Sequence, residues 1–309
     1  MKYFKKSKFN YGMLVLLVLC FAFILNLDNI KNFNWNGLIE TAVTSNNGEV
    51  ENKSIDYGMS VHFLDVGKAD CCYIECEDKR VLIDAADKEP TNAVVEYLER
   101  QKVKKLDLVV VSHPHRDHIG QMSSVIDNFK IDKFIAAKVP DNITPTYATY
   151  EKMLRTLNKN KVKIEYVKSG KKFEIGNMKI EILGPINYHN KLNSNSIVMK
   201  ITYGEVSFLF TGDAEKPEEE DIINSGENLK STVLKVGHHG SKTSSSYNFL
   251  LKVKPAYAVI SVAPDKSNLP KEIVLNRLNK FCDKIYRTDE NGTVIVRTDG
   301  KKIKFETEK

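Results

Sequence analysis

Three of the chain's seven histidines fall within six consecutive residues. They are His113, His115 and His118, and Asp117 stands among them. Imidazole and carboxylate groups hold zinc and similar divalent ions in proteins, and such an ion can activate a bound water near neutral pH. Pro114 inside the cluster argues against a helix, because proline removes a backbone donor and clashes with the preceding turn. The cluster therefore predicts a metal centre on a loop.

The flanking sequence indicates where this loop lies. Residues 106–111 are mostly apolar and read as a buried strand, and the Ser-His-Pro sequence that follows marks its end. In an extended segment neighbouring side chains point in different directions, so one part of the cluster can face one metal while Asp117 and His118 face another. A solvated polar loop is the plain alternative, but composition alone seldom places so many ligand residues together.

Two motifs further along the chain supply more ligand-type residues, again at the ends of strands. Residues 206–210 read as a strand that leads to Asp213 in a Thr-Gly-Asp turn. Residues 232–236 read as a second strand, which delivers His238 and His239 within a His-His-Gly-Ser sequence. Each motif alone is more often structural than catalytic. Their order behind the first cluster favours one shared site.

Taken together, these motifs resemble the metallo-β-lactamase superfamily. Within it the chain is similar to the ComEC-like branch, which contains the extracellular hydrolase domain of a competence DNA-uptake protein. The resemblance runs from residue 57 to the C-terminus, through segments 61–67, 195–198, 210–215, 234–241 and 286–292. Residues that depart from the usual pattern of the branch, and that can alter substrate contacts, are Lys68, Ala69, Cys71 and Leu269.

The resemblance implies a ligand set for one or two divalent ions, with zinc expected and manganese as the alternative. One ion would be held by His113 and His115 and the other by Asp117, His118 and His238, with Asp213 as a bridge. His239 is an alternative ligand to His238, or a hydrogen-bond donor to the transition state.

The first of these sites lacks the third histidine that most of the superfamily supplies. Asn195 and Ser196 occupy its place, so the first ion is expected to bind more weakly than the second. His189 is the only histidine between the cluster and Asp213, and it reads as a surface residue in a loop. His62 alternates with apolar neighbours on a strand and reads as a buried structural histidine.

The resemblance implies a phosphodiesterase or nuclease that acts through metal-activated water, with DNA as a candidate substrate and with Asp117 and Asp213 as catalytic residues. Polar residues near the motifs could contact the phosphate or simply stabilise turns: Asn195, Ser196, Ser241, Thr243 and Ser244. The same metals could also open a lactam, lactone or thioester. Two other readings stay open: a non-hydrolytic accessory module that binds DNA or an uptake partner, and an esterase acting on phosphocholine-bearing envelope polymers.

The N-terminal region predicts attachment to a membrane. Residues 1–10 form a basic head, and residues 11–27 form an uncharged apolar run at the lower end of the length that a spanning helix needs. Lysines in the head favour a cytoplasmic N-terminus, which places the rest outside the cytoplasm. Residues 28–56 read as a polar linker. A cleaved signal peptide, and hence a secreted protein, is the alternative.

The net charge gives little support for nucleic-acid binding through bulk electrostatics. Of the formal charge of +6, four units come from lysines in the first ten residues, and six less four leaves +2 for the remainder. A nearly balanced domain can bind phosphate only through a local patch.

From residue 57 to 309, strands and helices alternate, which by pattern alone gives an α/β domain. The resemblance narrows this to an αββα sandwich of two sheets between helices. Cys71 and Cys72 would point to opposite faces of a strand and so are unlikely to pair with each other. Cys72 or Cys76 could form a disulfide with Cys282, and free thiols are the equal alternative.

Overall fold

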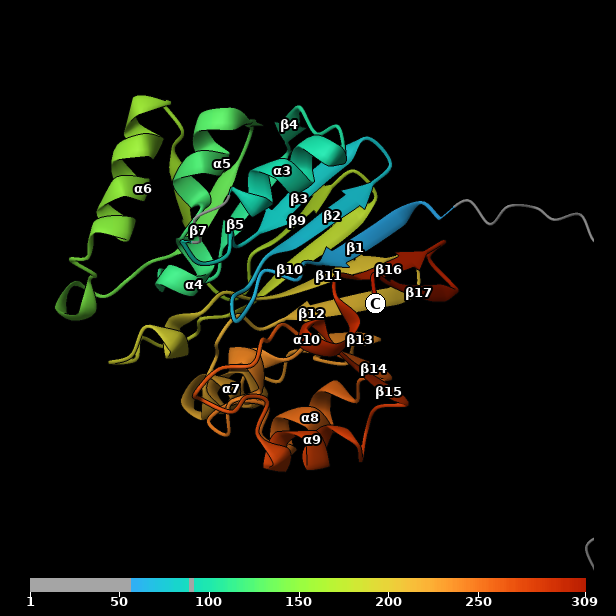
Figure 1. Ribbon diagram of the computed structural model, residues 1–309. Coiled ribbons are helices and arrows are strands. Elements are labelled where there is room, and N and C mark those ends of the chain that lie inside the picture. The colour runs from blue at the N-terminus through green and yellow to red at the C-terminus, as the bar shows by residue number, and fades with distance from the viewer. Residues whose placement is uncertain (1–56, 89–91) are drawn as a thin grey trace, which may run out of the picture. The chain divides into compact units, whose positions relative to one another are not determined.

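The computed structural model describes residues 57–88 and 92–309. Two large sheets stack face to face, and helices cover their outer faces (Figure 1). This is the predicted α/β sandwich, and both sheets are mixed. The predicted basic head, membrane anchor and linker, residues 1–56, lie outside the described residues. Among the helices that are described, none has the length and apolar character that a membrane crossing requires.

The first sheet has eight strands in the order β17-β16-β1-β2-β3-β5-β7-β8. Pairing is antiparallel from β17 to β3 and parallel from β3 to β8. The strands are β1 Met59–Phe63, β2 Cys72–Cys76, β3 Lys79–Ile83, β5 Leu108–Val111, β7 Phe134–Ala137, β8 Ile164–Val167, β16 Val294–Thr298 and β17 Ile303–Thr307. A separate small sheet pairs β4 Lys105–Leu106 with β6 Lys130–Ile131.

The second sheet has seven strands in the order β15-β14-β13-β12-β11-β10-β9. Its antiparallel half runs from β9 to β12 and its parallel half from β12 to β15. The strands are β9 Lys172–Ile175, β10 Met178–Gly184, β11 Val198–Tyr203, β12 Val206–Phe210, β13 Val233–Lys235, β14 Tyr257–Ile260 and β15 Lys284–Arg287.

The main core lies between the two sheets, because alternate side chains of each strand point inward. Phe63 of β1 stacks on Phe210 of β12 with ring centroids 6.1 Å apart. Cys72 belongs to this core, whereas Cys71 packs on the other side of the first sheet, as predicted for neighbours on an extended chain. All four cysteines in the described residues are free thiols.

Each outer face has its own layer of helices, packed through one apolar stripe (Figure 1). Helices α3 Ala93–Arg100, α5 Met122–Asn128 and α6 Ala148–Lys159 cover the first sheet. Helices α7 Lys216–Asn224, α8 Tyr247–Val253 and α9 Glu272–Leu278 cover the second. Val94 and Leu98 of α3, four residues apart, are both fully buried. The described residues also contain the short helices α4 Arg116–Ile119 and α10 Thr288–Asn291, and 3-10 turns at Asp141–Ile143, Asn193–Asn195 and Gly237–Gly240.

Candidate metal centre

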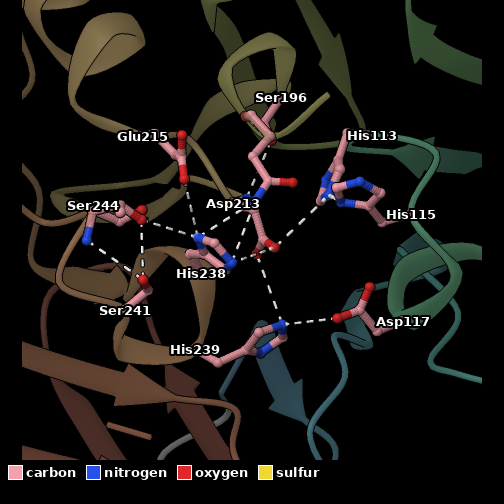
Figure 2. A network of polar contacts seen from close by, with 12 residues as sticks. His113, His115, Asp117, Ser196, Asp213, Glu215, His238, His239, Ser241 and Ser244 are labelled. Atoms are coloured by element: carbon pink, nitrogen blue, oxygen red, sulfur yellow. Dashed lines mark hydrogen bonds and ion pairs between the residues drawn. The ribbon is translucent and has the colours of Figure 1, made fainter. Parts of the chain in front are cut away.

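The predicted ligands come together where strands of both sheets end. Strand β5 leads to His113, β12 leads to Asp213, and β13 leads to His238 and His239. Figure 2 shows Asp213 in the middle of this group, with the others around it. The cluster is extended only as far as His115, whose φ and ψ are −66° and 153°.

The expectation of a wholly extended loop is corrected at that point. Helix α4 begins at Arg116, directly after Pro114 and His115, so proline stands before the helix rather than inside it. Asp117 and His118 therefore lie on a helical turn, and the His118 ring stays beside the His113 ring, with centroids 4.1 Å apart.

The second ligand group consists of Asp117, His118, Asp213 and His239, whose ligand atoms all lie within 4.8 Å of one another. His118 Nε2 and His239 Nε2 lie 3.3 Å and 3.8 Å from the same Asp213 oxygen, Oδ1. His239 Nε2 also lies 3.5 Å from Asp117 Oδ2. The structure thus places His239 where the sequence analysis put His238.

Buried partners fix the orientation of both histidines in the second group. His118 Nδ1 lies 2.8 Å from Asp84 Oδ2, and Asp84 also accepts from the Ser112 backbone N–H and hydroxyl at 2.8 Å and 2.7 Å. His239 Nδ1 lies 2.9 Å from the carbonyl oxygen of Ser261. A proton held at Nδ1 leaves each Nε2 lone pair free to bind a metal.

The first ligand group is smaller. His113 Nε2 and His115 Nδ1 lie 3.0 Å apart, and His113 Nε2 is 3.8 Å from the second Asp213 oxygen, Oδ2. These three residues form the group, and their ligand atoms lie within 4.8 Å of one another. Asp213 therefore turns one oxygen towards each group, which is the arrangement that the resemblance implied for a bridging carboxylate.

The unpaired atoms at the site fit divalent cations. Three fully enclosed atoms have no hydrogen-bond partner, and all belong to the second group: His118 Nε2, Asp213 Oδ1 and His239 Nε2. Leaving a buried polar atom unpaired costs about 1–3 kcal/mol, so three that converge need a common partner. Two imidazoles and two carboxylates suit zinc and also manganese, so the donor set supports a divalent ion without selecting one.

The charge state of Asp117 also suits the binding of a divalent cation. Burial raises the pKa of its carboxyl, but the imidazoles of His239, 3.5 Å away, and of His118 outweigh burial and hold the pKa well below its ordinary value. The side chain is 29% exposed, so this carboxylate is ionised and faces solvent on one side.

His238 lies on the far side of Asp213 from His113 in Figure 2. Its Nε2 is 3.8 Å from Asp213 Oδ2, while its Nδ1 is 3.3 Å from Thr243 Oγ1 and 3.7 Å from Glu215 Oε1. His238 and His239 both have left-handed backbone angles, with φ of 50° and 51°. Such angles cost about 1–2 kcal/mol in an L-residue, and here they let two adjacent histidines both face one carboxylate.

The residues expected to bind substrate divide into two sets. Asn195 and Ser196 are buried, and their side chains donate to carbonyls of their own loop, so neither is available to a ligand. Ser244 is also buried and donates to the carbonyl of Ala214. The hydroxyls of Ser241 and Thr243 lie 3.0 Å apart beside His238, at the edge of the site.

Two other histidines have the structural surroundings that the sequence suggested. His62 is buried, with Nδ1 2.6 Å from the Tyr97 hydroxyl, and burial lowers its pKa to about 4. His189 is partly exposed, and its Nε2 lies 2.9 Å from Asp221 of α7 rather than near Asp213. Among the described residues, no third histidine joins the first group.

A buried ion pair behind the second group was missed by sequence reasoning. Lys235 Nζ lies 2.8 Å from Asp70 Oδ1, and that oxygen is 3.5 Å from His239 Nδ1. The Asp70 backbone N–H also donates to the carbonyl of Asp117 at 3.0 Å. The available signal was a lysine within an apolar strand, because a buried charge requires a partner.

The site opens into a pocket of about 820 Å³. His115 and Asp117 form part of its wall, so a substrate in the pocket would contact the ligand groups. Its other lining residues are Val66, Lys68, Asp87, Arg116, Tyr147, Ala148, Thr149 and Asp265. Lys68, one of the departures from the ComEC-like pattern, is therefore in place to contact substrate.

Comparison with solved structures supports the fold. The metallo-beta-lactamase fold protein YhfI from Bacillus subtilis superposes with a TM-score of 0.52 at 14% identity, covering 77% of this chain and 98% of that one. An E377D mutant of the beta-hydroxylase CmlA superposes with a TM-score of 0.55 at 13% identity, covering 77% and 54%. At these identities the likeness concerns the fold alone.

Three of the sequence relatives are a ComE operon protein, a recombination protein and a competence protein. ComE operon protein 3 of Bacillus subtilis (strain 168) is 29% identical over 257 residues, which are 77% of this chain and 33% of that protein. Recombination protein 2 of Haemophilus influenzae is 30% identical over 243 residues, 76% and 28% of the two chains. Competence protein ComA of Neisseria gonorrhoeae is 31% identical over 204 residues, 65% and 26%. The chain thus spans about a third or less of these relatives.

The family assignment rests on most of the described domain. The model of the metallo-beta-lactamase superfamily matches residues 64–263, a range that contains every residue of both ligand groups. Distant homology to the three competence and recombination proteins agrees with that match. The chain therefore belongs to the metallo-beta-lactamase superfamily, with ComEC-like proteins among its relatives.

Proposed function

We propose that this chain is a metal-dependent hydrolase of phosphodiesters, a nuclease or related phosphodiesterase that acts outside the cytoplasm. The observation that carries the proposal is the position of Asp213, whose two oxygens each face a separate ligand group. A carboxylate so placed can hold two cations side by side although they repel each other.

The chemistry follows from the residues that surround the pocket. Two divalent cations, when bound, neutralise charge on phosphoryl oxygens and activate water for attack. His113 and His115 would hold one ion, while Asp117, His118 and His239 would hold the other. Asp84 fixes the orientation of the His118 imidazole, and the Ser261 carbonyl fixes that of His239. Asp117, ionised and partly exposed, belongs to the second ligand group and also lines the pocket.

The choice of phosphodiesters rests on the ComEC-like relatives, two of which are named for recombination and for competence. We expect the full-length protein to hydrolyse bis-p-nitrophenyl phosphate or DNA when zinc or manganese is supplied, and to lose this activity in a chelator. A phosphocholine ester and a β-lactam should be poor substrates. The measurement is the rate of product release for each substrate with each metal.

Two other results of this assay would replace the proposal. Preferential cleavage of the phosphocholine ester would favour an envelope esterase. A protein that binds DNA but cleaves no phosphodiester with either metal would be a non-hydrolytic accessory module. His189→Ala serves as the control variant, because His189 pairs with Asp221 outside both ligand groups, and it should keep the wild-type rate.

The proposed location is the cell membrane, with the catalytic domain on the outer side and residues 11–27 as the anchor. We expect the protein to fractionate with membranes and the domain to be removed when protease is added to intact cells. Protection of the domain until the cells are lysed would contradict the proposed orientation. Recovery of a shortened chain in the medium would instead indicate a cleaved signal and a secreted enzyme.

A further inference from the structure

The pocket beside the ligand groups contains two cationic side chains that each rest on a carboxylate. Arg116 Nε lies 2.8 Å from Asp87 Oδ1, and Arg116 Nη2 donates to Asp87 Oδ2 at 3.2 Å. Lys68 Nζ lies 3.1 Å from Asp265 Oδ2. Arg116 is 66% exposed and Lys68 is 33% exposed, so both pairs are solvated. Ion pairs of this kind contribute little, so a phosphate could take the place of either carboxylate.

The same pocket holds a fixed aromatic ring. Tyr147 precedes helix α6 and is 36% exposed, yet its hydroxyl donates to the carbonyl of Pro114 within the ligand cluster. Burial, with the nearby charge of Asp117 as a second cause, raises the pKa of Tyr147 to about 12, so the ring stays neutral. A ring anchored at its hydroxyl and open on its side is suited to stack on a planar group.

The amino end of helix α6 adds a positive electrostatic potential to the wall of the pocket. Ala148 and Thr149, its first two residues, line the pocket next to Tyr147. The first backbone N–H groups of a helix lack intrahelical partners, and the helix dipole is positive at this end, so anions are favoured there. Cations, a helix amino end and an aromatic ring therefore share one pocket with His115 and Asp117.

From this combination we infer that the pocket is a nucleotide subsite for single-stranded nucleic acid, in which Tyr147 stacks on a base while Arg116 and Lys68 bind phosphates next to the scissile one. Proteins hold single strands through backbone cations and aromatic stacking, because unpaired bases expose their faces. A duplex keeps its bases stacked inside and could not offer one to Tyr147. The inference deepens the proposed function and rests on it for the position of the scissile phosphate.

The test compares Tyr147→Leu with Tyr147→Phe in the full-length protein. The substrates are a single-stranded DNA oligonucleotide and an oligomer of the same length made of abasic sites, which carries the phosphates without the bases. Tyr147→Leu should raise KM for the oligonucleotide roughly 5- to 150-fold, as loss of one stacked base would, and leave KM for the abasic oligomer unchanged. Tyr147→Phe keeps the ring but loses the hydroxyl bond to Pro114, so it should retain the preference for the base-containing oligonucleotide that Tyr147→Leu loses.

The cations have a separate signature. Arg116→Gln and Lys68→Gln should each weaken the binding of the oligonucleotide and of the abasic oligomer to the same extent, because both oligomers carry phosphates. Each should also reduce the slope of log kcat/KM against log salt concentration by about 0.7, the value for one phosphate contact on a single strand. Lys130→Gln is the matched control, since Lys130 is an exposed cation paired with Asp132 and does not line the pocket. It should leave the slope unchanged.

Specific results would overturn the inference. Equal effects of Tyr147→Leu on the two substrates, or none on either, would exclude base stacking. A wild-type preference for duplex over single-stranded DNA would exclude the substrate class. If the wild-type protein cleaves no phosphodiester, the proposed function fails, and fluorescence anisotropy with the two labelled oligomers then decides the inference separately. Tighter binding of the base-containing oligomer, lost in Tyr147→Leu and kept in Tyr147→Phe, would uphold it.

Discussion

Asp213→Asn is expected to lower metal-dependent phosphodiester hydrolysis by roughly 10³-fold or more while the fold survives. Asp213 is the only residue in both ligand groups, with Oδ2 facing His113 and Oδ1 facing His118 and His239. An amide has one oxygen and no negative charge, so it cannot bridge two cations. The rate should be measured with bis-p-nitrophenyl phosphate or DNA at saturating zinc or manganese.

A matched control separates this effect from general damage. Asp107→Asn alters another buried carboxylate, which accepts from the Arg80 backbone N–H at 2.9 Å and lies outside both ligand groups. It should keep the wild-type rate. Asp117→Ala should behave like Asp213→Asn, because it removes a ligand from the second group. If Asp213→Asn and Asp117→Ala cleave at the wild-type rate, the activity comes from a contaminant or from another site.

The strands that carry the ligands could be predicted because they are buried and short. Strands β5, β12 and β13 are apolar runs bounded by turn residues, and a ligand follows each of them. The predicted strand at residues 106–111 is divided in the structure at Asp107. The carboxylate of Asp107 accepts a hydrogen bond from the backbone N–H of Arg80 on strand β3. The position of the ligand loop is unaffected, because strand β5 still ends at Val111 as predicted.

Three strands of the two large sheets have only a weak strand pattern in the sequence, and all three lie at sheet edges. They are β8, β9 and β15. Each exposes part of its length, as in the pattern of Lys172–Ile175, where alternate residues are exposed. Edge strands need fewer apolar residues and often carry lysine, so their hydrophobic pattern is weak. None of them carries a ligand, and the site could therefore be outlined without them.

The choice between His238 and His239 could not be made from the sequence. The two residues are adjacent, and their directions depend on left-handed backbone angles that only the surrounding structure imposes. Gly240, which follows them with φ of 81°, packs so closely on Pro270 that a Cβ would lie 2.4 Å from that ring. This contact lies 30 residues along the chain and is invisible to motif reasoning.

A large loss of folding stability is expected when the buried ion pair between Lys235 and Asp70 is broken. Lys235 is 2% exposed and Asp70 is 3% exposed, and they lie 165 residues apart in the chain. Burial lowers the pKa of Lys235, but Asp70 beside it more than compensates, so the pKa is raised and the ammonium stays charged. Asp70 Oδ1 also faces His239 Nδ1 at 3.5 Å, and Asp70 lies close to Asp84 and His118.

Lys235→Met should therefore lower the free energy of unfolding by about 3–5 kcal/mol, measured by urea denaturation in the presence of a chelator. Methionine fills much of the same space but leaves Asp70 as an uncompensated buried charge. Lys235→Met combined with Asp70→Asn removes that charge and should recover much of the loss.

Lys200→Met provides the comparison for this loss. Lys200 is also a buried lysine, but its partner Glu181 is 24% exposed at its side chain, so water can solvate the carboxylate that remains. The expected loss there is only about 1 kcal/mol. A Lys235→Met protein as stable as Lys200→Met would mean that Asp70 finds another partner, and the adjacent His239 would be the first candidate. In that case the same substitution should also weaken metal binding, because a protonated His239 held by Asp70 is a poorer ligand.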